Sequence, residues 1–277
     1  MTKFNLSLDG RVAIVTGASG GVGKAAVLAL ADAGASVVGT DINIELMQNI
    51  ASEIQSKGGK ALAIKADVTR KQEVDAVVEE AVKAFGTVDI LVNNAGVESF
   101  FPLMRLREDG WDKVFDVNVK GYYLFAQAAG RVMMKNKRGS IIQIGSGAGW
   151  LANPYSGAYC ASKAAVEQLS RVLAVELGYS NIRVNTIAPG FIRTNMLGDA
   201  KLDNDEMLKR LSELVPLKRV AEPDDIAAVI LFLASDLSAY VNGASIYVDG
   251  GVTLTGYNVD EVARSIPPKY RDLTILP

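Results

Sequence analysis

The sequence predicts an α/β protein built on a parallel β-sheet with helices on both faces. Two observations lead to this class. Short apolar, β-branched runs alternate with longer segments of helical periodicity from one end of the chain to the other. Each intervening helix is also long enough to cross between two parallel strands, which predicts right-handed β-α-β units. The 277 residues contain no linker, repeat or low-complexity block, so 1–277 is predicted to form a single domain.

The predicted elements follow one another in a regular order. The first strand is an apolar run that ends at a glycine, and the later strands have the same short, β-branched character. The strands are expected at 11–16, 36–40, 61–65, 88–92, 140–144, 182–187 and 244–248. The helices are expected at 21–33, 44–57, 69–85, 111–135, 156–177 and 223–234.

Local signals set the ends of several helices. Gly34 closes the first helix, and the glycine pair at 58–59 closes the second. Thr69 and Gln72 have the spacing of a capping box, which predicts the start of the third helix. Near the end of the chain, Pro223 at a first helical position is followed by two acidic residues, which also marks a helix start.

The composition excludes several classes of function. The chain contains no histidine, so neither a Ser-His-Asp triad nor a histidine zinc site is possible. Cys160 is the only cysteine, which excludes an internal disulfide and a cysteine-cluster zinc site, and no metal is predicted. The net charge of -2 gives no basic surface for nucleic acid. No signal-peptide pattern and no apolar run of about 18 residues is present, so we expect a cytoplasmic protein that does not bind membranes.

A glycine-rich turn lies between the first predicted strand and the first predicted helix. Glycines in such a turn let backbone N–H groups approach a pyrophosphate, and the start of the helix adds partial positive charge. Because this cluster follows a strand and opens a helix, it predicts dinucleotide binding. The expected contacts are Gly17, Ser19, Gly21, Val22 and Gly23.

Asp41 is the residue expected to choose between NAD and NADP. It ends the second predicted strand, where a carboxylate can accept hydrogen bonds from the adenosine ribose and would repel a 2′-phosphate. Gly20 is not basic and no arginine follows Asp41 closely, so the sequence predicts NAD as the cofactor. Further contacts near the ribose and adenine are expected from Ile42, Asp67 and Val68.

Tyr159 and Lys163 are expected to carry the chemistry. They are four residues apart on a predicted helix, so they lie on one face of it. The charge of Lys163 is expected to lower the pKa of Tyr159 from its reference value of about 10, which would make the phenol a general acid/base. Ser146, upstream, would hold the substrate oxygen through its hydroxyl. Such a pair supplies the base that alcohol oxidation needs without histidine or metal, while a nicotinamide accepts the hydride.

Seven motifs in one order resemble the short-chain dehydrogenase/reductase family over about residues 9–251. They are Thr16-Gly17-x-x-x-Gly21-x-Gly23, Asn93-Asn94-Ala95-Gly96, Asn118, Ser146, Tyr159-x-x-x-Lys163, Pro189-Gly190 and Asp249-Gly250-Gly251. The resemblance implies a Rossmann-like, doubly wound sheet of seven parallel strands in the order 3-2-1-4-5-6-7. It also implies an NAD-preferring enzyme with an Asn-Ser-Tyr-Lys tetrad, usually assembled as a homotetramer, with a homodimer as the alternative.

The resemblance assigns a role to each matching residue. Tyr159 would exchange a proton with the substrate oxygen, which Ser146 would orient. Lys163 would hold the nicotinamide ribose, and Asn118 would anchor a water linking Lys163 to solvent. Asn93 resembles a structural residue. Further cofactor contacts are implied for Asn94, Gly96, Pro189, Ile192 and Thr194.

The sequence leaves the substrate open and suggests only where it would bind. The candidate contacts are Glu98, Ser146, Trp150, Tyr155, Phe191 and Met196. Their aromatic rings suggest a partly apolar pocket, in which Glu98 would accept a hydrogen bond from a substrate hydroxyl. The polar segment 191–216 is predicted to be a lid that closes over the substrate and excludes water.

Two regions are expected to contact neighbouring subunits. The tail 255–277 is predicted to dock near the active site of another copy. The helix that contains Tyr122, Tyr123, Leu124 and Phe125 is expected to form part of an oligomer interface, because it carries more aromatic surface than one sheet face can use.

The sequence therefore favours an NAD-dependent oxidoreductase that interconverts a small secondary alcohol and a ketone. One alternative is a 3-oxoacyl carrier-protein reductase, which would predict a preference for NADPH and a basic docking patch near the site entrance. A second alternative is a non-catalytic NAD-binding protein, which should have lost Tyr159, Lys163 or Ser146, and all three are present.

Overall fold

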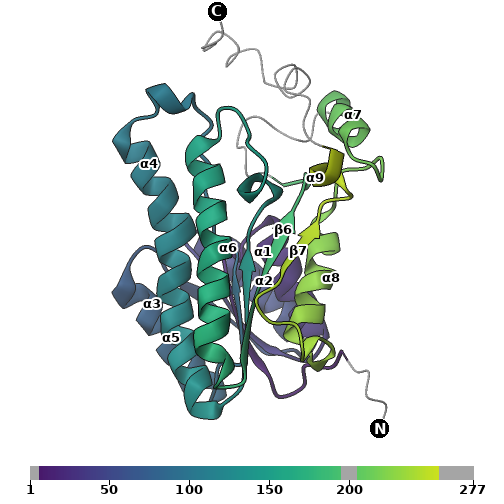
Figure 1. The fold of residues 1–277 in the computed structure, drawn as a ribbon. Coiled ribbons are helices and arrows are strands. Elements are labelled where there is room, and N and C mark those ends of the chain that lie inside the picture. The colour runs from purple at the N-terminus through teal and green to yellow at the C-terminus, as the bar shows by residue number, and fades with distance from the viewer. Residues whose placement is uncertain (1–5, 195–204, 256–277) are drawn as a thin grey trace, which may run out of the picture.

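The structure of the chain is a computed structural model that describes residues 6–194 and 205–255. Seven parallel strands form one sheet in the order β3-β2-β1-β4-β5-β6-β7, which confirms the order implied by the family resemblance (Figure 1). The strands are β1 (Val12–Thr16), β2 (Ser36–Asp41), β3 (Ala61–Lys65), β4 (Ile90–Asn93), β5 (Gly139–Ile144), β6 (Ile182–Pro189) and β7 (Ser245–Val248).

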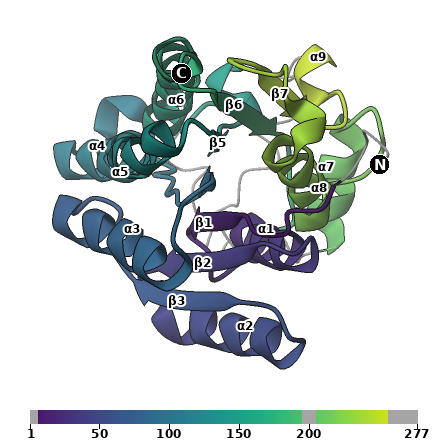
Figure 2. The same cartoon turned by 90° about the horizontal axis from the view of Figure 1, so that it is seen from below.

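Helices cover both faces of this sheet. They are α1 (Gly21–Asp32), α2 (Ile44–Ser56), α3 (Lys71–Phe85), α4 (Glu108–Phe115), α5 (Gly121–Asn136), α6 (Gly157–Gly178), α7 (Asp205–Leu214), α8 (Pro223–Ala234) and α9 (Val252–Thr255). Figure 2 looks along the strands and shows α3, α5 and α6 on one side, with α1, α2 and α8 on the other. The predicted doubly wound arrangement is therefore confirmed. None of the helices within the described ranges is both long and apolar enough to cross a membrane.

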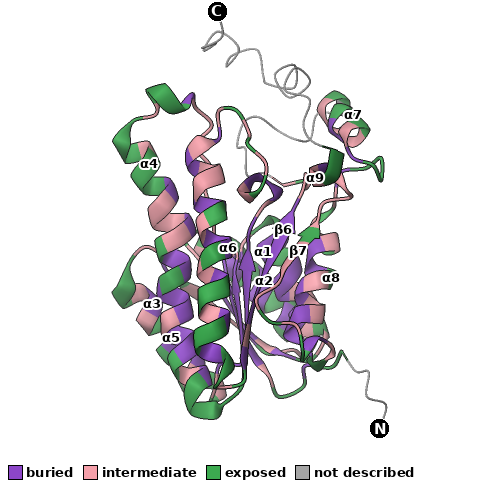
Figure 3. Cartoon of the chain, viewed as in Figure 1, coloured by how far each residue is buried: buried purple, intermediate pink, exposed green. Residues whose placement is uncertain are grey.

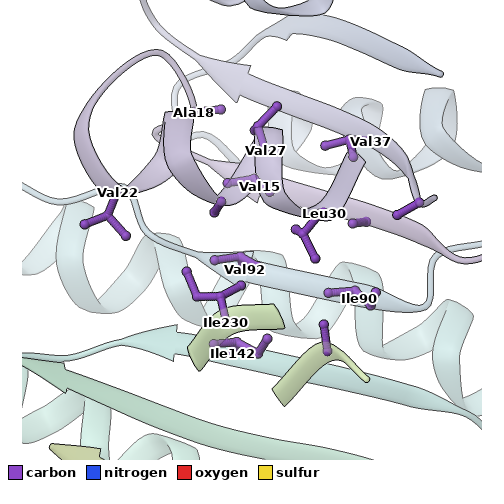
Figure 4. Packing of buried hydrophobic residues seen from close by; sticks show 14 of the residues in the cluster. Val15, Ala18, Val22, Val27, Leu30, Val37, Ile90, Val92, Ile142 and Ile230 are labelled. Atoms are coloured by element: carbon purple, nitrogen blue, oxygen red, sulfur yellow. The ribbon is translucent and has the colours of Figure 1, made fainter. Parts of the chain in front are cut away.

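The central strands are buried on both faces, which explains why the sequence shows apolar runs there rather than alternation. Every residue of β1 is buried, and Figure 3 shows the inner part of the sheet in the colour of buried residues. Successive residues of a strand point to opposite faces of the sheet. Val15 packs with the α1 and α8 side, whereas Ile14 packs with the α3 and α5 side. Figure 4 shows Val15 and Val92 in the same layer as Leu30 of α1 and Ile230 of α8. Each fully buried side chain of this size contributes about 1.5–3 kcal/mol to stability.

The single helix predicted over 111–135 is instead three consecutive segments. Between α4 and α5 lies a π-helical turn, η2 (Asp116–Lys120), in which the Gly121 N–H donates to the Asp116 carbonyl five residues back. Such a turn holds one residue more than an α-helical turn and changes the direction of the side chains within it. Asn118 lies in this turn and is completely buried.

The predicted capping box at Thr69 and Gln72 is wrong. The residue before α3 is Arg70, and no side chain caps it. The turn before the helix is held instead by Asp67, whose Oδ1 accepts from the Thr69 N–H at 2.9 Å and from its hydroxyl at 2.8 Å. A Glu73 carboxylate oxygen accepts from the Asp67 N–H at 2.8 Å. Asp67 is therefore the better hydrogen-bond acceptor for this turn, and it lies two residues before the predicted box.

The predicted start of the helix at Pro223 is confirmed. Pro223 is the first residue of α8, and Asp225 Oδ2 accepts from the Glu222 N–H at 2.8 Å. Arg219 donates to both oxygens of the Asp225 carboxylate, which fixes the loop that leads into this helix.

The structure describes only parts of the predicted substrate lid and of the predicted C-terminal tail. In the predicted lid 191–216, the part at 205–214 forms helix α7, whose Leu211 packs with Val220. Met196 and residues 256–277 of the predicted tail lie outside the described residues.

The aromatic segment expected at an oligomer interface lies mostly inside the chain. Tyr122 is 1% exposed, Phe125 is completely buried and Leu124 is 9% exposed, so these three side chains do not form an outer surface, while an interface on this helix stays a prediction. Their side chains pack between α5 and the sheet, and the helical period alone does not distinguish such an inner face from an outer one. Only Tyr123 is exposed, at 44%.

Candidate active site

The carboxyl ends of β1, β4, β5 and β6 open into one cavity of about 1080 Å³. In doubly wound sheets a ligand site forms at this edge, where neighbouring strands connect in opposite directions. Its wall runs from the glycine turn before α1, past the end of β5, to the first turns of α6. The cavity is therefore long enough to join the predicted catalytic residues to the glycine turn at 17–23. This turn is the predicted binding site for the cofactor phosphates and is called the cradle below.

The glycine turn has a shape that side chains would destroy. A Cβ at Gly23 would lie 2.0 Å from the Gly17 carbonyl oxygen, and one at Gly17, whose φ is +61°, would lie 2.8 Å from the Ala95 Cα. The residue before α1 is Gly20, and no side chain in the described part of the chain caps the helix there. The first N–H groups of α1 consequently point at the cavity end without a side-chain acceptor, which fits the pyrophosphate of a dinucleotide.

Thr16 and Asn94 lock this turn to the neighbouring strand. Thr16 Oγ1 accepts from the backbone N–H groups of Asn94 and Ala95, each at 3.0 Å. Asn94 Nδ2 donates to the carbonyls of Thr16 and Gly17, each at 3.0 Å. The amide side chain thus joins the loops after β1 and β4. The neighbouring Asn93 donates to Tyr122 O and Gln143 Oε1 in the interior, in keeping with its expected structural role.

Asp41 lies in the cavity wall at the rim of the cradle. Its Oδ2 accepts from the Ser19 N–H at 3.1 Å and its Oδ1 accepts from the Asn43 N–H at 2.9 Å. These two bonds fix the carboxylate against the glycine turn, and each oxygen retains a lone pair for a further donor. The arrangement can therefore accept hydrogen bonds from a ribose diol.

Most of the predicted cofactor residues line the cavity. Those in the wall are Gly17, Ser19, Gly21, Val22, Asp41, Asn94, Gly96, Tyr159, Lys163, Pro189, Ile192 and Thr194. Those outside the wall are Gly23, Ile42, Asp67 and Val68. Gly23 lies beneath the turn and Val68 is buried against Gly121, whereas Ile42 is 69% exposed.

Tyr159 and Lys163 face the same end of the cavity from one side of α6. Lys163 Nζ lies 5.6 Å from the centroid of the Tyr159 ring, as the spacing of four residues predicts. The lysine is 1% exposed and its Nζ donates to the Ile144 carbonyl at 2.8 Å. Its second partner is Tyr122, whose Oη accepts from Nζ at 3.4 Å and itself donates to the Ile144 carbonyl at 3.1 Å.

The expectation that Lys163 lowers the pKa of Tyr159 is wrong in this structure. Burial raises the pKa of Tyr159 well above its usual value, the charge of Glu98 raises it further, and a hydrogen bond with Ser146 acts in the opposite direction. Burial also lowers the pKa of Lys163 to about 7, against the opposing effect of Glu98. Both shifts have the same physical cause, because removal from water disfavours the charged form of either group. Burial therefore favours the protonated form of the phenol.

Asn118 connects three parts of the site from its π-helical turn. Its Oδ1 accepts from the Val97 N–H at 2.9 Å, and its Nδ2 donates to the Val97 carbonyl at 2.9 Å and to Ser162 Oγ at 3.0 Å. Ser162 Oγ in turn donates to the Tyr159 carbonyl at 2.7 Å. The side chain therefore holds the loop after β4 against the catalytic helix. The side chain is completely buried, so Asn118 is not a surface residue.

Glu98 is an acidic group near Tyr159 and Lys163. It lines the cavity, and its Oε1 accepts from the Ser156 hydroxyl at 2.5 Å. Burial raises the pKa of Glu98, while the Ser156 hydrogen bond and the charge of Lys163 act to lower it. Ser156 is the residue that precedes α6, so this bond ties the loop after β4 to the start of the catalytic helix.

The predicted substrate residues divide into two groups. Glu98, Ser146 and Phe191 lie in the wall. Trp150 lies outside the wall and is 73% exposed. Tyr155 also lies outside the wall, with its ring 5.5 Å from that of Phe100.

Three residues that contribute to the site were not predicted. Tyr122 is a partner of Lys163, Ser156 is the partner of Glu98, and Asn153 lines the cavity beside them. Tyr122 lies four residues after Asn118, a helical spacing that places it one turn further along the same side. Ser156 and Asn153 lie in an irregular loop and have no comparable sequence signal.

The comparisons with known proteins agree with this geometry. The family model described as enoyl-(acyl carrier protein) reductase matches residues 17–253. The chain is 41% identical to the 3-oxoacyl-acyl-carrier-protein reductase FabG of Thermotoga maritima, over 90% of this chain and 100% of that protein. It is 39% identical to the D-threitol dehydrogenase of Mycolicibacterium smegmatis, over 91% of this chain and 96% of that protein.

A solved structure with the same arrangement is a gluconate 5-dehydrogenase from Burkholderia cenocepacia in complex with NADP and tartrate. It superposes with a TM-score of 0.85 at 34% identity, covering 90% of this chain and 98% of the other. The sheet order, the cavity and these matches over most of the chain confirm the family that the motifs resemble. The chain belongs to the short-chain dehydrogenase/reductase family of oxidoreductases.

Proposed function

We propose that the protein interconverts a secondary alcohol and a ketone with NAD as its cofactor. The observation that carries this proposal is the single cavity in which Tyr159, Ser146 and Lys163 lie at one end and the glycine turn with Asp41 at the other. A bound nicotinamide supplies the hydride for ketone reduction and accepts it in alcohol oxidation. The protein groups must then position the substrate oxygen and move one proton.

Tyr159 is assigned the proton transfer. With its pKa raised by burial, the phenol holds its proton at neutral pH and can donate it to a carbonyl oxygen as that oxygen gains negative charge. Ser146 is hydrogen-bonded to Tyr159 and is placed to hold the same oxygen. In the oxidation direction the phenol must first ionise, which requires positive charge close to it. Lys163 provides this charge when it is protonated, and with a pKa of about 7 its charge varies across the neutral range.

The preference for NAD is proposed from Asp41. Its carboxylate is fixed at the rim of the cradle by the N–H groups of Ser19 and Asn43. Two fixed acceptor oxygens match the two hydroxyls of an adenosine ribose, whereas a 2′-phosphate would bring negative charge against them. Gly20, in the adjoining turn, offers no side chain that could compensate.

The proposal can be tested with purified protein and both cofactors. A panel of alcohols, sugars, polyols, steroids and hydroxy acids is followed at the absorbance of the reduced nicotinamide. We expect oxidation with NAD, and we expect Asp41→Ala to lower the NAD-to-NADP ratio of kcat/KM by about tenfold or more, since a charged hydrogen bond is lost. The control is Asp32→Ala, at the exposed far end of α1. An unchanged ratio in Asp41→Ala would contradict the assignment to NAD.

The similarity to 3-oxoacyl-acyl-carrier-protein reductases supports a second candidate. That activity would act on a ketone carried by an acyl thioester. The panel therefore includes a 3-oxoacyl thioester with NADPH. Reduction of this thioester in preference to every alcohol or ketone in the panel would favour the second candidate.

We also propose a homotetramer or homodimer that uses the outer face of α5 and α6. These helices lie side by side at one edge of the molecule in both ribbon views (Figures 1 and 2). The exposed apolar side chains of α5 are Tyr123 and Met134, those of α6 are Val172 and Val175, and Tyr179 directly follows the end of α6. Val175 is 70% exposed and Tyr179 is 97% exposed, which is typical of a surface that a second copy covers. Light scattering of the full chain measures the assembly directly.

A further inference from the structure

We propose that Glu98, Asn153 and Ser156 form a subsite for a second hydroxyl of the substrate, so that the enzyme acts on a small uncharged polyol and its hydroxyketone. This inference rests on the proposed alcohol dehydrogenase activity and names its substrate class. All three residues lie in the wall of the catalytic cavity, together with Tyr159.

The subsite lies close to the reacting groups. Ser156 immediately precedes α6 and Tyr159 is three residues further on, which corresponds to about 4.5 Å along a helix axis. Glu98 is tied to this point by the 2.5 Å hydrogen bond from Ser156 Oγ to its Oε1. The loop after β4 that carries Glu98 also passes the lysine, because a Cβ on Gly96 would lie 3.7 Å from Lys163 Nζ. A group held by Glu98 would therefore lie within one or two carbons of the carbon that Tyr159 serves.

The free groups of the subsite are hydrogen-bond acceptors. Ser156 uses its hydroxyl proton on Glu98 Oε1, and no residue in the described ranges donates to Glu98 Oε2. Asn153 Oδ1 is buried and has no hydrogen-bond partner among the residues at 6–194 and 205–255. Glu98 Oε2 is not fully enclosed, so a ligand in the cavity can reach it, whereas Asn153 Oδ1 is enclosed and must turn toward the cavity to accept from the same ligand. Because acceptors without donors are unfavourable, the wall matches a ligand that brings hydrogen-bond donors of its own. A substrate hydroxyl provides such a donor, whereas a thioester or an alkyl chain does not.

The negative charge of an ionised Glu98 also discriminates between classes of substrate. An ionised Glu98 would repel a substrate carboxylate placed beside it, which disfavours hydroxy acids and sugar acids. A 3-oxoacyl chain has no hydroxyl at this position, so it would also leave Glu98 without a hydrogen-bond donor. A site built to hydrogen-bond a hydroxyl rejects an analogue that lacks it by a large factor, about 10⁴ in the strongest cases. The same residues thus favour a polyol over the acyl thioester of the second candidate function.

The test compares substrates that differ by one group. The full-length enzyme with NAD oxidises butane-2,3-diol, butane-1,3-diol, butan-2-ol and 3-hydroxybutanoate, and kcat/KM is measured for each. We expect at least one diol to exceed butan-2-ol by about 100-fold and 3-hydroxybutanoate by more. Glu98→Gln, which keeps the shape and removes the charge, is expected to lower the ratio of diol to butan-2-ol by about tenfold or more. Ser156→Ala is expected to lower it in the same direction.

The ratio separates the subsite from catalysis. Glu98 also raises the pKa values of Tyr159 and Lys163, so its replacement changes turnover, but this effect is common to diol and mono-alcohol and cancels in the ratio. The control is Glu79→Gln on the exposed side of α3, where the ratio should stay within about twofold of wild type. A ratio that Glu98→Gln leaves unchanged would overturn the subsite.

Two further measurements complete the test. 3-Aminobutan-2-ol is included because an ammonium group is also a donor, and a clear preference for it over the diols would overturn the assignment to uncharged polyols. Diol binding is also measured calorimetrically on enzyme loaded with NADH. If no alcohol is oxidised, the proposed function fails, yet diol binding that Glu98→Gln weakens would still support the subsite. Binding that the variant leaves unchanged would overturn it.

Discussion

The two ends of the cavity are constructed in different ways. At the cradle end, Gly17 and Gly23 bring backbone atoms so close together that a single added carbon would lie 2.0–2.8 Å from its neighbours. At the reaction end, the ionisable side chain of Lys163 is fully buried, and those of Tyr159 and Glu98 are partly buried in the cavity wall. The properties of the cradle end therefore depend on close backbone packing. Those of the reaction end depend on the electrostatic cost of burying ionisable groups.

This difference separates the ways in which the two ends can fail. A change of shape at the cradle should reduce the affinity for the dinucleotide. It should not change the rate of proton transfer in enzyme that has bound the dinucleotide. A change of one ionisable group at the reaction end should reduce turnover and leave the dinucleotide affinity intact. The ionisable groups also oppose folding, because the folded state must hold them in an apolar environment. Three substitutions test this contrast, and they follow in order of expected effect.

The largest effect is expected for Tyr159→Phe. The variant keeps the ring and removes only the hydroxyl that transfers the proton, so kcat should fall by about 10³-fold or more. NADH affinity, measured by fluorescence titration, should stay within about threefold of wild type because the cradle is unchanged. Tyr240→Phe, which alters a fully exposed tyrosine outside the cavity wall, is the control and should keep full activity. Turnover retained by Tyr159→Phe would show that another group moves the proton.

The next effect concerns stability and its dependence on pH. The pKa of Lys163 is about 7 in the folded chain, below the value of 10.5 of an unperturbed lysine. Between these two values the unfolded chain binds more protons, so this group makes wild type more stable as pH rises from 7 to 10. Lys163→Met removes that dependence. The stability of the variant relative to wild type should therefore increase by about 3 kcal/mol as pH falls from 10 to 7.

Urea unfolding at a series of pH values measures this difference. The constant loss of the hydrogen bond to the Ile144 carbonyl shifts the whole curve of the variant, but it does not create a slope with pH. Lys135→Met, at an exposed position in the last turn of α5, is the matched control and should show no such slope. A parallel pair of curves for wild type and Lys163→Met would mean that the lysine remains charged in the folded chain.

The sequence predicts the backbone of this molecule better than its electrostatics. The strands are apolar runs because both sheet faces are covered, so β1 and β5 can be located directly from composition. The π-helical turn at 116–120 could not be, since a helix with one extra residue in a turn has the same residue types as a regular helix. The start of α3 was misplaced for a similar reason, because Asp67 and Thr69 are both good capping residues.

In the site, the spacing of Tyr159 and Lys163 predicts that they face one cavity, and the structure agrees. The direction of the Tyr159 pKa shift could not be predicted, because it depends on how completely the loops after β4 and β5 exclude water. The acceptor subsite was also only partly predictable. Ser156 reaches Glu98, and Asn153 reaches the cavity wall, through a loop in which Tyr155 has a φ of +68°, a conformation that few residues other than glycine adopt and that no local pattern indicated.

The smallest of the three effects, Gly23→Ala, tests the cradle end. Its new Cβ would lie 2.0 Å from the Gly17 carbonyl oxygen, so the turn must open. We expect a loss of about 2 kcal/mol in the free energy of unfolding and about tenfold or more in NADH affinity. The pH dependence of kcat at saturating NADH should stay that of wild type, because Tyr159 and Lys163 are untouched. Gly130→Ala is the matched control, since it also lies within a helix but, among the described residues, its Cβ would meet only Leu177, at 3.9 Å. That variant should be as stable as wild type or slightly more so, because alanine favours a helix over glycine by about 1 kcal/mol. If the two alanine variants bind NADH equally well, close backbone contact does not shape the cradle, and the contrast between the two ends of the cavity is lost.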